Sequence, residues 1–218
     1  MTCSVKAMLA VAAMTGLTAC SNNSSDEGGS GPLGVLAQTA GGIVAARRAP
    51  EAPAPARSPQ ETAAEALRVN SGPLIQVGFE SLGRSPIMAM TGQNGAMRTY
   101  MTPAEEAVIL RDGMLVGTRG LGSDLSVAEP GTEALIRAGR SGQGTRIMRY
   151  LGGDALERPL QFACRTSPGP NPGVIIESCD GHGVTFQNNY LVQNGQIPVS
   201  RQWVGPGLGY VTIQTLRP

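Results

Sequence analysis

Residues 184–204 read VTFQNNYLVQNGQIPVSRQWV, and this stretch decides the fold class. Its first half alternates between apolar and polar side chains, so Phe186 and Tyr190 share one face of a β-strand, which we expect to face the core. Asn194-Gly195 follows, and both residue types tolerate the positive φ of a tight hairpin turn. The stretch therefore predicts two antiparallel strands joined by a two-residue turn.

The second strand of this hairpin carries the most distinctive side chains of the chain. Simple alternation places Arg201 and Trp203 on one face, on the same side as Tyr190, and Gln202 on the other. Pro198 has no N–H to donate, which predicts an edge strand or a bulge.

Two interpretations of this cluster remain open. In the first, Arg201 and Trp203 are buried, Arg201 is paired with an acid or with carbonyls, and Gln202 is free to bind ligand. In the second, Tyr190, Arg201, Gln202 and Trp203 form a surface that binds a glycan or a protein partner, because tryptophan stacks on sugar faces as readily as it fills a core.

The same short runs, split by turn residues, recur through the rest of the chain. Asp112-Gly113 between two apolar runs predicts a second tight hairpin. Residues 120–144 are less regular and predict a crossover with a short helix from Thr132 to Ala138. The predicted strands span 74–80, 86–91, 96–102, 106–111, 114–119, 145–151, 159–165, 173–179, 184–192, 197–204 and 209–216.

A helix is predicted over 59–69, because Ser58 can cap it and Glu61 stands in capping-box register. The pattern as a whole indicates an all-β, mainly antiparallel fold. We expect a twisted β-sandwich or an incompletely closed barrel with one or two short helices.

The N-terminus has the order of a signal peptide, with Lys6, a short apolar run and then Leu17-Thr18-Ala19-Cys20. This tetrapeptide resembles the lipobox of bacterial lipoproteins, so residues 1–19 are expected to be removed and Cys20 to be acylated. Two or more acyl chains would hold the protein stably on a membrane. Ser21, where an Asp would favour inner-membrane retention, predicts the outer membrane, with the domain facing the periplasm.

Residues 20–58 are rich in Gly, Ser, Pro and Ala and are expected to form a disordered tether. The folded domain is therefore predicted to span 59–218.

The charge balance and the cysteine content argue against a nucleic-acid partner and a metal site. The chain has 17 Lys and Arg against 16 Asp and Glu, with no basic run that would bind nucleic acid. Cys164 and Cys179 form an even pair in an exported protein, which predicts a disulfide. With one nearby histidine, His182, the two cysteines fall short of a four-ligand metal site, and no cofactor is expected.

No catalytic residue is assigned from the sequence. His182 stands between glycines in a predicted turn, which gives poor positioning for acid–base chemistry. Spacing alone cannot pair the carboxylates for sugar hydrolysis. The candidates considered for that chemistry are Asp112, Asp124, Glu129 and Glu177. The arginines expected to form a solvated face are Arg146, Arg149, Arg158 and Arg165.

Three stretches carry a family resemblance: LRDGMLVGTRGLGSDL over 110–125, FQNNY over 186–190, and SRQWVGP over 200–206 with the closing residues 213–218. They resemble the YjbF/GfcB family of outer-membrane lipoproteins, whose genes accompany exopolysaccharide or group 4 capsule synthesis. Leu191 and Pro198 depart from the large side chains usual in that family, so an aromatic groove there would be reduced.

The resemblance implies an all-β envelope lipoprotein that works beside polysaccharide-export components and has no transferable enzymatic reaction. Three functional hypotheses follow. The first is a non-catalytic accessory factor that contacts the polysaccharide or other export proteins. The alternatives are a glycan-modifying hydrolase and a structural envelope module that binds only protein.

Overall fold

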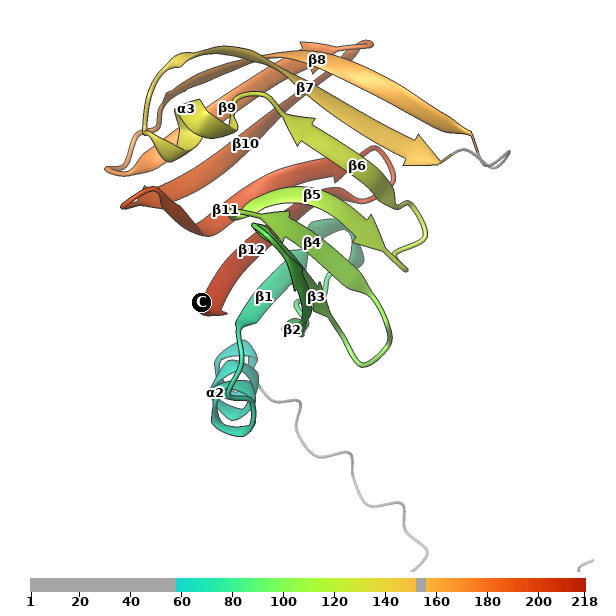
Figure 1. Cartoon of the computed structure of the whole chain (residues 1–218), viewed down its shortest axis with the longest axis vertical. Coiled ribbons are helices and arrows are strands. Elements are labelled where there is room, and N and C mark those ends of the chain that lie inside the picture. The colour runs from blue at the N-terminus through green and yellow to red at the C-terminus, as the bar shows by residue number, and fades with distance from the viewer. Residues whose placement is uncertain (1–57, 152–155) are drawn as a thin grey trace, which may run out of the picture. The chain divides into compact units, whose positions relative to one another are not determined.

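The computed structural model describes residues 58–151 and 156–218, which belong to a compact unit that begins at Pro55 (Figure 1). The predicted signal peptide, the acylation site Cys20 and nearly all of the tether lie outside the described residues. In the described part of the chain, no helix is long and apolar enough to cross a membrane.

The described chain begins with helix α2 (Pro59–Val69), as predicted. The Ser58 hydroxyl accepts a hydrogen bond from the Glu61 N–H, and the Glu61 carboxylate accepts one from the Ser58 N–H. This capping box satisfies two of the donors that a helix leaves free at its start. Arg217 ties the helix to the last strand by donating to the carbonyls of Leu67 and Asn70.

The twelve strands of the described chain form one antiparallel sheet in the order β5-β4-β3-β2-β1-β12-β11-β10-β9-β8-β7-β6. Except for β1 and β12, hydrogen-bonded neighbours are also neighbours in sequence. The strands are β1 (Leu74–Phe79), β2 (Ile87–Asn94), β3 (Met97–Met101), β4 (Ala107–Arg111), β5 (Met114–Arg119), β6 (Leu125–Pro130), β7 (Gly142–Leu151), β8 (Glu157–Pro168), β9 (Val174–Gly181), β10 (Val184–Gln193), β11 (Gln196–Gly205) and β12 (Gly209–Arg217). The two short helical elements among them are η1 (Glu80–Leu82) and α3 (Glu133–Arg137).

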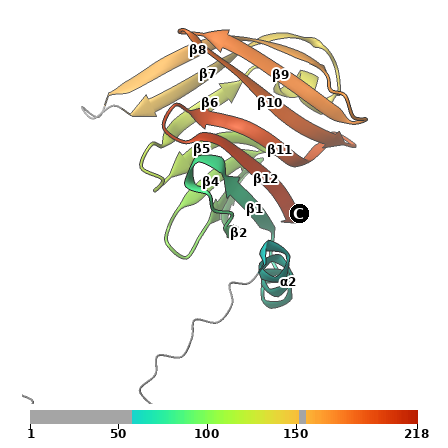
Figure 2. The ribbon, with the colours of Figure 1, turned by 180° about the vertical axis from the view of Figure 1, so that it is seen from behind.

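The sheet curls until its two edges, β5 and β6, lie side by side (Figures 1 and 2). Side chains bridge the seam: the Leu125 N–H donates to Thr118 Oγ1 at 2.9 Å, and the Arg119 guanidinium donates to the carbonyls of Leu125 and Ser126. These bonds occupy edge groups that would otherwise be open to another chain. The prediction of an all-β fold with an incompletely closed barrel is confirmed.

The prediction missed one strand, β6, inside the region assigned to a crossover. Its sequence LSVAEP contains a proline and a glutamate, which are rare in strands. Pro130 is tolerated because β6 is an edge strand that pairs only with β7. The predicted short helix does follow it, as α3.

Both predicted tight turns are present. Asp112 and Gly113 have φ of 49° and 84°, and Asn194 and Gly195 have φ of 52° and 76°. Positive φ at both central residues is the backbone geometry of the favoured two-residue hairpin turn.

The predicted faces of β11 were wrong for Arg201 and Gln202, whereas Trp203 lies in the core. Gln193 pairs with Gln196, but Leu191 pairs with Val199, so β11 holds one extra residue opposite β10. This bulge exchanges the two faces of β11 for the residues that follow it as far as Gln202. Ser200 and Gln202 therefore lie on the side of Tyr190, and Arg201 lies on the opposite side. The bulge itself was among the alternatives that Pro198 predicted.

The interior contains two apolar clusters. The larger includes Phe79, Phe162, Phe186 and Trp203, and Trp203 stacks on Phe186 with ring centroids 4.4 Å apart. The smaller lies beneath α3, where Ile136 contacts the cluster that contains Tyr190. Trp203 is buried like its neighbours Gln202 and Val204, so the in–out alternation of β11 stops near its end.

The disulfide between Cys164 and Cys179 is present and joins residues that are directly opposite on β8 and β9. We expect the Cys164→Ala/Cys179→Ala variant to lose roughly 3 kcal/mol of unfolding free energy, because the bond closes a loop with a sequence separation of 15 residues. Urea denaturation of oxidised wild type, reduced wild type and the variant measures this. An unchanged midpoint in both reduced wild type and variant would contradict it.

Candidate functional site

A polar cluster centred on Glu177 of β9 lies in the interior that the curled sheet encloses. Glu177 is 0% exposed, and its carboxylate accepts hydrogen bonds from Arg146 Nη2 at 2.7 Å and from Asn188 Nδ2 at 2.8 Å. The Tyr190 hydroxyl donates to it at 3.1 Å, and the Thr132 hydroxyl completes the set. Residues from β7, β9, β10 and the start of α3 are thus joined at one carboxylate.

The charge state of this cluster follows from its contacts. Burial by itself would raise the pKa of Glu177, but attraction to Arg146 and the hydrogen bonds from Thr132 and Asn188 outweigh it, so the pKa lies below its ordinary value. Burial raises the pKa of Tyr190 well above its ordinary value. The centre is therefore an ion pair with a neutral phenol, which is an arrangement for holding strands together.

Gln202 extends the cluster to the edge strand β5. Its amide oxygen accepts the Leu115 N–H at 3.0 Å, and its amide nitrogen donates to the Gly113 carbonyl at 3.1 Å. A second bond from that nitrogen reaches Ser200 Oγ. The side chain thereby serves as a hydrogen-bonding partner for an edge strand that has a paired strand on one side only, a role that alternation in sequence did not predict.

Tyr190, Gln202 and Trp203 are therefore interior residues, and of the four predicted binding residues only Arg201 reaches the surface. Whether any of them binds a glycan or a partner stays a prediction. Arg146 contradicts the expected solvated face, because it is 1% exposed. Its alternation with Met148 and Tyr150 in β7 is the signal that could have placed it inside.

Arg201 lies on the outer face, at the centre of an exposed charged cluster. Its guanidinium pairs with Glu80, with Nε 2.6 Å from a carboxylate oxygen, and stacks over the Tyr210 ring at 3.6 Å from the centroid. The hydrogen bond from Arg201 lowers the pKa of Glu80. The Tyr210 hydroxyl accepts the Gln187 N–H, so the aromatic ring is held against the sheet.

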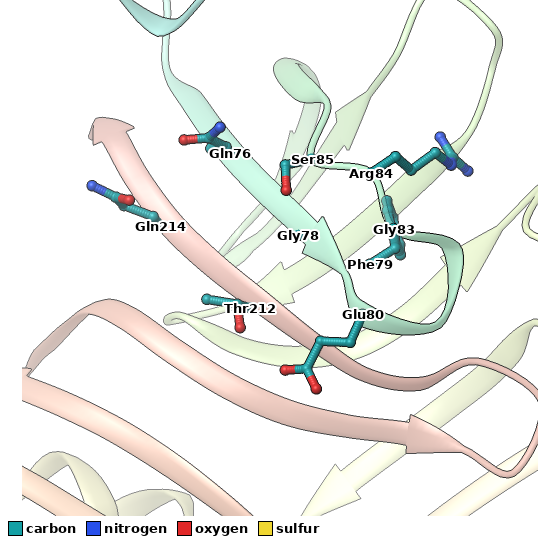
Figure 3. Close-up of a pocket in the computed structure, with 9 residues that line it drawn as sticks. All are labelled: Gln76, Gly78, Phe79, Glu80, Gly83, Arg84, Ser85, Thr212 and Gln214. Carbon is teal, nitrogen blue, oxygen red and sulfur yellow. The ribbon is translucent and has the colours of Figure 1, made fainter. Parts of the chain in front are cut away.

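A shallow groove of about 410 Å³ begins beside this cluster and follows the outer faces of β1 and β12 (Figure 3). Gly78 lies at the floor of the groove. A side chain at this position would fill part of the groove, because its Cβ would lie 3.3 Å from Ser85 Oγ. The side chains of Gln76, Ser85 and Gln214 line it with groups that can both donate and accept hydrogen bonds. This surface is suited to a hydroxyl-rich or peptide-like partner, and the sequence analysis did not identify it.

The remaining candidates for chemistry have structural contacts. His182 lies in the β9–β10 turn with φ of 54°, and its Nε2 accepts the Gln161 N–H at 3.1 Å. Glu177 lies near Cys164 and Cys179, but both sulfurs are consumed in the disulfide, so this group is not a metal site.

The carboxylates considered for sugar hydrolysis each have their own partner. Asp112 pairs with Arg137, and Glu129 pairs with Arg149. Asp124 accepts hydrogen bonds from Thr118 and from the backbone of the loop that precedes it.

The chain is similar to known proteins in sequence and in fold. The family model described as "Group 4 capsule polysaccharide lipoprotein gfcB, YjbF" matches residues 37–216. Among solved structures, the crystal structure of the hypothetical lipoprotein YmcC from Escherichia coli (K12) aligns with a TM-score of 0.59 at 16% identity, covering 73% of this chain and 88% of that one. At this identity the likeness shows a shared fold. No curated protein matches the chain.

The variant Glu177→Gln tests the interior cluster. It leaves the buried guanidinium of Arg146 without a counter-ion, so we expect a loss of roughly 3–5 kcal/mol of unfolding free energy at neutral pH. Urea denaturation measures this loss. Glu80→Gln is the matched control, because it breaks a half-exposed pair whose contribution is below about 1 kcal/mol. Equal losses in the two variants would contradict a special role for the interior pair.

The difference in unfolding free energy between wild type and Glu177→Gln should depend on pH. The folded state holds Glu177 ionised at a lowered pKa, whereas the unfolded state takes up the proton near its ordinary pKa of about 4.3. The stabilisation is therefore complete above that pH and is lost as the pH falls through the folded-state pKa. The stability gap between wild type and Glu177→Gln should narrow over this range in a pH series of denaturation curves, and a gap that widens on acidification would refute the assignment.

Proposed function

Because the chain belongs to the YjbF family of group 4 capsule polysaccharide lipoproteins, we propose that it is a non-catalytic accessory factor in exopolysaccharide or capsule production. The single observation that carries this proposal is the family match over residues 37–216, which includes every described residue up to Leu216. We further propose that it acts at the outer membrane, through contacts with the polysaccharide or with other export proteins.

The proposed anchor is Cys20. Its place after Leu17-Thr18-Ala19 supports acylation, and Ser21 supports sorting to the outer membrane. Several acyl chains turn reversible membrane binding into stable attachment, since each buried CH₂ contributes about 0.8 kcal/mol. A Gly-, Ser- and Pro-rich tether would allow the domain to work in the periplasm while its lipid stays in the bilayer.

A non-catalytic role is supported by the contacts of the candidate residues. A hydrolase of this kind needs two carboxylates that face one substrate. Here Glu177 has no solvent access and neutralises Arg146, while Asp124 holds a loop in place. The outer groove beside Arg201 instead offers hydrogen bonds without an activated nucleophile.

Gene deletion tests the proposal. We expect the deletion strain to produce less secreted or surface polysaccharide, wild-type protein to restore the yield, and Cys20→Ala to fail because it cannot be acylated. Polymer yield and chain length, together with fractionation of the protein between membrane and soluble pools, are the measurements. Unchanged polymer in the deletion strain would refute the proposed function.

Two biochemical results would replace it with one of its rivals. Release of reducing ends from the cognate polymer by the pure protein, abolished in Asp124→Asn or Glu177→Gln variants that still fold, would identify a hydrolase. Silence on a glycan array combined with a stable protein partner in pull-downs would identify a module that binds only protein.

A further inference from the structure

A second and larger cavity, of about 600 Å³, lies among three hairpin turns. It is bounded by the turns between β2 and β3, between β4 and β5, and between β10 and β11, and it reaches Thr215 near the end of β12. The volume falls within the range of about 300–1,000 Å³ that is usual for ligand sites.

The cavity contains a cation without a counter-ion. Arg98 of β3 is half-buried in its wall, and in the described residues its guanidinium has no ion pair or hydrogen bond. The acidic side chain that also lines the cavity, Asp112, is already paired with Arg137 at 2.9 Å, and Pro218 lines the cavity as well. The wall therefore carries a local positive charge that is available to an anionic ligand.

A tyrosine hydroxyl in the same cavity also lacks a protein partner among the described residues. Tyr100 lines the same cavity and is 3% exposed, yet its hydroxyl has no hydrogen-bond partner in the part of the chain that the structure describes. Every fully enclosed side-chain polar atom of that part does have a partner. The Tyr100 hydroxyl must therefore reach solvent, and the cavity that it lines provides the opening.

The rest of the lining suits a ligand with many hydroxyl groups. Gln193 and Gln196 present amides with no protein partner in the described residues, and Gln93 uses its amide nitrogen on the Gly95 carbonyl, which leaves its oxygen as an acceptor. Amides both donate and accept, as sugar hydroxyls do. A phosphate ion would use the single cation but would leave this ring of neutral groups without a role.

We propose that this cavity binds a segment of acidic polysaccharide, with a uronate carboxylate on Arg98 and sugar hydroxyls on Tyr100 and the surrounding amides. The choice of a polysaccharide as the ligand rests on the proposed function. The cavity adds the charge of that ligand and the site at which it binds. An arginine can bind a carboxylate through two parallel hydrogen bonds, which adds geometric selectivity to the charge attraction.

The test is calorimetric titration of the full acylated chain in detergent. The probes are a hexasaccharide of alternating glucuronic acid and N-acetylglucosamine, a hexamer of galacturonic acid, and the carboxyl-reduced form of each. At least one acidic probe should bind wild type, and its reduced form should bind about tenfold more weakly, a loss of about 1.4 kcal/mol, because the reduced form lacks the carboxylate that Arg98 would bind.

Three variants locate the binding. Arg98→Gln should weaken the acidic probe about tenfold and leave the reduced probe unchanged. Tyr100→Phe should weaken both forms about fivefold while its unfolding midpoint stays at the wild-type value, because the hydroxyl has no protein partner to lose. Arg165→Gln removes the same charge from an exposed position on β8 outside the cavity and should bind like wild type.

Several results would overturn the proposal. They are the absence of binding by both acidic probes, equal binding of acidic and reduced forms, and an equal effect of Arg98→Gln and Arg165→Gln. Loss of binding in Tyr100→Phe together with lower stability would mean that the residue acts structurally, and would also count against it. If these results occur while gene deletion still lowers polymer yield, the proposed function is retained and only the proposed binding site is refuted.

Discussion

The buried ion pair between Arg146 and Glu177 holds β7, β9, β10 and the start of α3 together. A charge placed in a protein interior is costly unless a partner and further hydrogen bonds compensate for it. Here one carboxylate accepts bonds from β7, β10 and the residue that precedes α3. A shift of any of these elements would leave a charge buried and unpaired, so the pair selects one register among the alternatives that apolar packing alone would allow.

Gln202 is a second buried polar side chain that joins separate parts of the sheet, here at the seam between β5 and β6. An up-and-down sheet that does not close leaves β5 and β6 with free backbone groups. Gln202 satisfies part of β5 from inside, while Thr118 and Arg119 bridge β5 to β6 from their own strand. The incomplete barrel is thereby stabilised by side chains at the place where backbone hydrogen bonding stops.

The interior polar residues and the surface polar residues therefore have different roles. The interior polar groups are occupied with one another, which leaves binding to the outer groove beside Arg201 and to the cavity that contains Arg98. The two surfaces differ in charge balance, because Arg201 is neutralised by Glu80 whereas Arg98 has no counter-ion in the described residues. An anionic ligand would therefore favour the cavity, and a neutral partner would find both surfaces open to hydrogen bonding.

The order of strands, turns and the first helix can be predicted from local sequence signals. Asp112-Gly113 and Asn194-Gly195 specify tight hairpins, Ser58 and Glu61 specify the helix start, and the alternation around Phe186 specifies a core face, because these signals are local. The directions of Arg201 and Gln202 and the burial of Arg146 depend on how the strands pack in three dimensions. A one-residue bulge at Pro198 reverses the directions of Arg201 and Gln202, and a buried arginine is stable only beside a carboxylate that folding brings to it from a strand 31 residues away.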